Sequence, residues 1–92
     1  MDTAESYRAF FATWPKDLPV DGYVVTNVGD TIPFKSYAVS AGLVVLDRDK
    51  PDSYGSRRVV LGYDQIAALK LSAPTDLSIF QQMGFKQIKH ST

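Results

Sequence analysis

Four residues near the middle of the chain form its one cluster of basic and aromatic side chains. Arg57 and Arg58 closely follow Tyr54, and Arg48 lies on the other side of the hairpin loop expected here. Arginine binds phosphate, and an exposed tyrosine can stack on a nucleic-acid base. Successive residues of a strand face opposite sides, so the two adjacent arginines cannot serve one surface. The cluster is therefore a candidate contact site for nucleic acid or another partner. The alternative role is to keep a sheet edge soluble.

Three aspartates in the same region, Asp47, Asp49 and Asp52, are the nearest approach to a metal-binding pattern. Their spacings of two and three resemble the alternating carboxylates of a calcium loop. However, Arg48 and Lys50 interleave with them, and no later acidic residue in the loop supplies a bidentate ligand. The pattern favours a solvated loop tip, so we expect no metal ion.

Residues for nucleophilic or cofactor chemistry are scarce in this sequence. His90 is the only histidine, and it stands third from the end, where we expect a frayed chain. A catalytic imidazole must be held within hydrogen-bond reach of its nucleophile. The glycines occur singly and form no phosphate-binding motif. The sequence therefore predicts no enzymatic activity, no catalytic residue and no cofactor.

Length and charge restrict the classes of protein further. The chain has 92 residues, enough for one domain, and its ten basic residues balance ten acidic ones. A net charge of zero argues against a dedicated polyanion binder. There is no cysteine and no apolar run of the roughly 18 residues that a membrane helix needs. Because residues 1–11 start acidic and lack a long apolar run, we expect that they are not a secretory signal. We expect a cytoplasmic protein that does not enter a membrane.

A helix is predicted over residues 1–14, because its apolar residues recur at helical spacing. Pro15 ends this helix at or before Trp14. Phe10, Phe11 and Trp14 give the helix a large aromatic face. Such a face packs either into the core or against a partner, so these three residues form a candidate interaction face.

Five strand-like runs are predicted within residues 20–72, where β-formers alternate with turn residues. They cover Val20–Val28, Ile32–Ser40, Leu43–Leu46, Arg57–Gly62 and Ile66–Leu71. The last two runs are separated only by Tyr63, Asp64 and Gln65, which suits a single 3-10 turn. A short helix over 75–84 and a tail over 85–92 complete the predicted single domain.

The order of these elements resembles the Sm/Sm-like (Hfq-like) superfamily of small β-barrels. The local similarity covers Val59 to Leu71, where Leu61 to Ile66 is similar to the second family motif. Tyr63 stands at the position of a family glycine, and no arginine precedes it. The family's RNA-contacting Asp and Asn have a partial counterpart, because Asp30 has no asparagine after it.

The resemblance implies a small, mostly β fold: a five-stranded, strongly bent SH3/Sm-like barrel with an N-terminal helix and a short C-terminal helix. An SH3-like barrel fits the same strand pattern. The family joins edge strands into rings, so the expected function is a non-enzymatic module that forms a homo-oligomer or binds a protein partner. Ile32–Ser40 and Arg57–Gly62 are the two candidate edges. RNA binding through the basic cluster is the alternative function.

Overall fold

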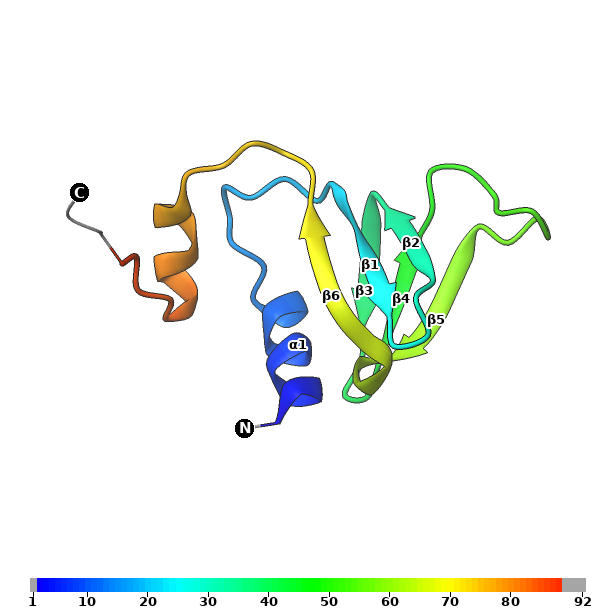
Figure 1. Ribbon diagram of the computed structural model, residues 1–92, viewed down its shortest axis with the longest axis horizontal. Helices are drawn as coiled ribbons and strands as arrows, with labels where there is room; N and C mark the ends of the chain where they lie inside the picture. Colours follow the sequence, from blue (N-terminus) through cyan, green and yellow to red (C-terminus); the bar gives the residue numbers. More distant parts are fainter. Residues whose placement is uncertain (1, 89–92) are drawn as a thin grey trace.

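The structure is a computed structural model, and it describes residues 2–88 (Figure 1). Over this range the chain forms one α-helix, six strands and two 3-10 helices. In chain order they are α1 (Thr3–Ala12), β1 (Gly22–Thr26), β2 (Thr31–Phe34), β3 (Ser36–Val39), β4 (Leu43–Asp47), β5 (Arg58–Gly62), η1 (Tyr63–Gln65), β6 (Ile66–Leu71) and η2 (Leu77–Met83).

The six strands form two antiparallel sheets of three strands each, in the orders β2-β1-β6 and β3-β4-β5. Among the described residues, no strand of one sheet pairs with a strand of the other, so there is no closed barrel. The prediction of a five-stranded SH3/Sm-like barrel over residues 20–72 is therefore wrong. The mostly β composition and the N-terminal helix are confirmed.

The chain leaves one sheet for the other at Lys35, which divides the predicted strand Ile32–Ser40 in two. Pro33 faces Tyr23 of β1 and has no N–H to donate. The N–H of Lys35 instead donates to the carbonyl of Asp47 in β4, at 3.0 Å. Before Lys35 the chain therefore pairs with β1, and after it the chain pairs with β4. The sequence predicts one continuous strand across Lys35 because β-forming residues lie on both sides of it.

The 3-10 turn predicted between the last two strands is present as η1. Asn27, which lies in the β1–β2 turn, makes two hydrogen bonds to η1. Its side-chain Nδ2 donates to the carbonyl of Asp64 at 2.7 Å, and its N–H donates to the carbonyl of Gln65 at 2.9 Å. These bonds connect the end of β1 to the start of β6.

Helix α1 begins where Asp2 accepts a hydrogen bond from the N–H of Glu5, at 2.8 Å. It ends at Ala12, before Pro15, as the sequence predicts. The predicted helix over 75–84 is the 3-10 helix η2, which ends at Met83 and is capped by Gly84, whose φ of 89° suits glycine. Of the predicted tail over 85–92, residues 89–92 lie outside the described range.

The core draws side chains from both sheets, α1 and η1. Its centre is aromatic: the ring of Phe11 lies 5.0 Å from that of Tyr37 and 6.0 Å from that of Phe34. The buried members of the core are Phe11, Val24, Ile32, Phe34, Val44, Leu46, Tyr63 and Ile66. Within residues 2–88, no helix has the length and apolar character needed to cross a membrane.

Candidate interaction surface

The predicted basic and aromatic cluster is divided between two faces of sheet β3-β4-β5. The N–H of Arg48 donates to the carbonyl of Arg57 at 2.7 Å, so these two arginines meet at the base of the β4–β5 loop. Arg58 follows on the opposite face, where its Nε lies 3.4 Å from the carboxylate of Asp47. Tyr54 lies within the loop and is 94% exposed. The four residues therefore do not form one continuous surface.

Two of the three predicted aspartates, Asp47 and Asp52, have structural partners. Asp52 accepts the N–H groups of Tyr54 and Ser56, both at 2.9 Å, and these bonds hold the pKa of its carboxyl below the ordinary value. Asp47 accepts the hydroxyl of Ser36 at 2.9 Å. Over residues 2–88, no group of three or more His, Asp or Glu side chains is placed to hold a metal ion. His90 lies outside the described residues.

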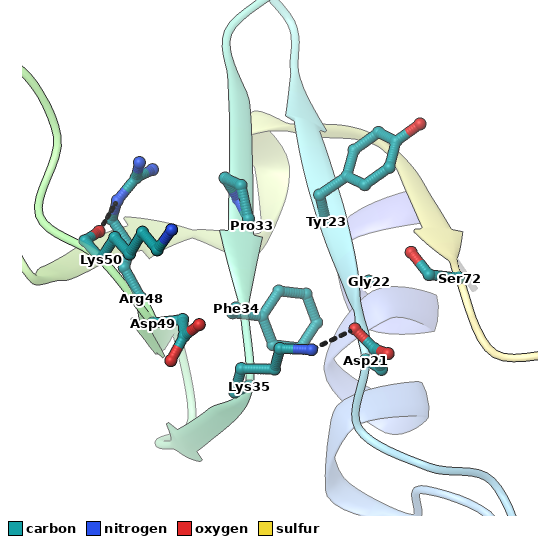
Figure 2. Close-up of a pocket in the computed structure, with 10 residues that line it drawn as sticks. All are labelled: Asp21, Gly22, Tyr23, Pro33, Phe34, Lys35, Arg48, Asp49, Lys50 and Ser72. Atoms are coloured by element: carbon teal, nitrogen blue, oxygen red, sulfur yellow. Dashed lines mark hydrogen bonds and ion pairs between the residues drawn. The ribbon is translucent and has the colours of Figure 1, made fainter.

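A groove of about 380 Å³ lies between strands β1 and β2 and the start of the β4–β5 loop (Figure 2). Two of its basic side chains, Lys35 and Arg48, bond within the chain. Lys35 Nζ lies 2.8 Å from the carboxylate of Asp21, and this bond raises the lysine pKa. Arg48 Nε donates to the carbonyl of Lys50 at 3.1 Å. With Asp49 also on its wall, the groove has mixed charge and is a weak site for a polyanion.

The predicted aromatic face of α1 turns largely inward. Phe11 is 2% exposed and belongs to the core. Trp14 is half-buried, and its Nε1 donates to the carbonyl of Leu18 at 2.8 Å. Phe10 packs edge-on against Trp14 and, with Phe80 of η2, lines an apolar groove of about 480 Å³. Of the three predicted residues, Phe10 is the one that lines this groove.

A different apolar surface lies on the outer face of sheet β3-β4-β5. Ala38, Val45 and Val60 stand side by side across the three strands, on the face opposite the buried Val44. Val60 is 59% exposed, and Leu43, which lies on the same face, is 48% exposed. We call Ala38, Leu43, Val45 and Val60 the outer apolar face.

The sequence contains a signal for this surface. Leu43–Leu46 is apolar at every position, so both faces of β4 carry apolar side chains. In the structure Val44 and Leu46 fill the core, whereas on the other side of the strand Leu43 is exposed and Val45 is half-buried. A fully apolar strand in a sheet with one buried face indicates a second contact surface.

The outer apolar face ends at a free strand edge. β5 pairs with β4 on one side, and no described strand pairs with it on the other. The carbonyl of Arg57 accepts from the N–H of Arg48, the residue that follows β4. Because bonded pairs alternate along an antiparallel ladder, Val59 and Leu61 also direct their N–H and C=O groups toward β4. The same groups of the alternate β5 residues, Arg58, Val60 and Gly62, point to the free edge.

Comparisons of this chain with protein-family models, with curated proteins and with solved structures find no match. The Sm-like resemblance therefore stays a prediction that no match tests.

The outer apolar face and the free edge of β5 together can bind an extended chain. Unpaired backbone groups at a sheet edge can accept another strand, and exposed valine and leucine side chains supply apolar contact area. Arg58 and Asp47 border this surface with one charge of each sign. The chemistry of this surface is suited to contact with protein backbone and apolar side chains.

Proposed function

We propose that this chain is a non-enzymatic protein-interaction module that binds a second copy of itself or another protein. The binding surface is the outer apolar face with the adjoining free edge of β5. The observation that carries the proposal is the row Ala38, Val45 and Val60, which runs across the sheet and stops at an edge strand with unpaired backbone groups.

The exposure of this row supports an interaction role. Burying apolar surface contributes about 25 cal/mol per Å², so a valine and a leucine that are half exposed gain free energy when a partner covers them. Isolated exposed apolar residues are ordinary on protein surfaces. Here, by contrast, the exposed residues Ala38, Leu43 and Val60 adjoin the half-buried Val45 on one sheet face.

Substitution of Leu43 by lysine tests the proposal without changing the core, because this side chain is on the outer face. Val28→Lys is the matched control, since Val28 is 82% exposed in the β1–β2 turn and away from this face. Self-association is measured by sedimentation velocity, and binding of other chains by peptides selected from a random library on the wild-type protein.

We expect Leu43→Lys to lose self-association or peptide binding while Val28→Lys keeps it. The proposal is contradicted when the wild-type chain neither associates nor selects peptides. It is equally contradicted when the two lysine variants behave alike.

A second candidate function is nucleic-acid binding, favoured by the fully solvated ring of Tyr54 in a loop flanked by Arg48 and Arg57. The pairing of Arg58 with Asp47 weighs against it. Titration of a labelled oligonucleotide at low salt tests this function, because phosphate contacts weaken steeply as salt increases. No binding at low salt excludes it.

The proposal includes a cytoplasmic location, as expected from a sequence without cysteine. Expression as a fluorescent fusion, followed by cell fractionation, checks this part independently of the binding surface.

A further inference from the structure

The free edge of β5 is complementary to itself. Arg58, Val60 and Gly62 are the residues whose backbone groups point to this edge, and Val60 is the middle one. An antiparallel copy of the strand, related by a two-fold axis at Val60, places each Val60 opposite the other. It also places Arg58 opposite Gly62 of the second copy. In the sheet that the two copies would form, Val60–Val60 and Arg58–Gly62 are hydrogen-bonded pairs.

Charge complementarity supports this register. A Cβ built on Gly62 would lie 2.6 Å from Oδ1 of Asp64, so the Asp64 carboxylate stands over Gly62. Gly62, Val60 and Arg58 alternate along one strand and share the outer face. In the two-fold arrangement, Arg58 of each copy therefore meets the space above Gly62 that holds the Asp64 carboxylate of the other copy.

Both charges are available for this contact. The Arg58 side chain is 75% exposed, and its one ion pair among the described residues is the 3.4 Å contact with Asp47. Neither ion pair found within residues 2–88 includes Asp64. An arginine on an edge strand ordinarily discourages strand pairing. Here the residue opposite it has no side chain, and the nearest charge has the opposite sign.

The rest of the edge fits a second copy as well. Figure 1 shows β5 as the outermost strand of its sheet, with no other strand beyond it. Pairing would join two three-stranded sheets into one, and the row Ala38, Val45 and Val60 would continue into the same row of the partner. Such an interface is isologous, which is the commonest form of homodimer.

We propose that two copies of this chain form a two-fold dimer by antiparallel pairing of their β5 strands, with Arg58 of each copy paired to Asp64 of the other. The inference rests on the proposed function and names the partner as a second copy in a defined register. The contact is small for a protein interface, so the dimer is expected to be weak and dependent on concentration.

Charge reversal tests the register. Arg58→Asp and Asp64→Arg are each expected to weaken dimerisation about tenfold, because each replaces two attractive contacts by two repulsive ones. The double variant restores both contacts with their signs exchanged, so it should recover wild-type association. Lys16→Asp and Asp17→Arg change the net charge equally at an exposed turn and should leave the dimer unchanged.

Sedimentation velocity up to about 1 mM protein supplies the dissociation constants. Amide exchange measured by NMR supplies a second readout, since the N–H groups of Val60 and Gly62 should become protected as the dimer forms. Recovery in the double variant together with this protection supports the proposal.

Three results would overturn it. They are a monomer throughout the concentration range, single variants that associate like the wild type, and a double variant that fails to recover although it is folded. If Leu43→Lys abolishes binding while the charge variants do not, the β5 pairing is wrong and the proposed function stands. If Leu43→Lys also has no effect on association or peptide binding, both fail.

Discussion

The hydroxyl of Tyr37 donates a hydrogen bond of 2.7 Å to the backbone carbonyl of Phe11. This bond joins strand β3 to the last turn of helix α1, where backbone carbonyls lack helical partners. It sits beside the contact between the two rings, whose centroids are 5.0 Å apart. The aromatic face of the helix is thus attached to the sheet by a polar and an apolar contact together.

Removing this hydroxyl should destabilise the fold with little change in packing. We expect Tyr37→Phe to lower the free energy of unfolding by about 1 kcal/mol, because the carbonyl of Phe11 loses its partner in a half-buried place. Tyr54→Phe is the control, since that side chain is 94% exposed. Urea denaturation measures both. An equal effect of the two substitutions would contradict the structural role of the bond.

Truncation of Phe11 should have the largest effect of any substitution in the helix. Phe11→Ala leaves a cavity among the rings of Trp14, Phe34 and Tyr37, and we expect a loss of about 3–5 kcal/mol. Phe85→Ala, at a side chain that is 56% exposed, should cost much less. Thermal and urea unfolding compare them. A mild effect of Phe11→Ala would place this residue on the surface, as part of an interaction face.

Gly22 and Gly42 form a matched pair for testing the sheet β2-β1-β6. A Cβ on Gly22 would collide with the carbonyl oxygen of Lys70 in β6, whereas a Cβ on Gly42 meets nothing within 4 Å. We therefore expect Gly22→Ala to destabilise the protein by about 1–3 kcal/mol, since the backbone of β1 or β6 must shift to make room. Gly42→Ala should be nearly neutral. Circular dichroism melting of the two variants decides, and equal melting temperatures would refute the close β1–β6 approach.

The stability should fall at alkaline pH because of Tyr63. Burial raises the pKa of this phenol above its ordinary value of 10.0, although the charge of Arg8 acts in the opposite direction. Above that value the unfolded chain loses the proton first, so the unfolded state binds fewer protons than the folded state. The contribution of Tyr63 to the free energy of unfolding is therefore constant below about pH 10 and decreases as the pH rises further.

Tyr63→Phe isolates this contribution. The variant loses the hydrogen bond from the hydroxyl to the carbonyl of Ser40, so it should be less stable at neutral pH. Between about pH 8 and about pH 11 it should lose less stability than the wild type, because the titrating phenol is gone. Urea midpoints across this range are the measurement. Parallel pH profiles of the two proteins would show that Tyr63 does not contribute.

Several local features could be predicted from the sequence because neighbouring residues decide them. Asp2 and Pro15 limit helix α1, and the three polar residues 63–65 leave room only for a 3-10 turn. The division of the six strands into two separate sheets, in place of the predicted barrel, was not predictable in this way. Whether Ile32–Ser40 remains one strand depends on Lys35 bonding to Asp47, and that bond joins residues twelve positions apart.

The candidate surface, too, could be predicted from the sequence only in part. Residue types and their spacing predict that Leu43–Leu46 is apolar on both sides and that Phe11 belongs to an aromatic helix face. The same pattern does not predict that Phe11 is buried while Leu43 and Val60 are exposed, because this depends on how the elements pack together. The physical reason is that apolar patterning shows which side chains gain by leaving water. The packing of α1 and the two sheets decides which of them the chain itself can cover.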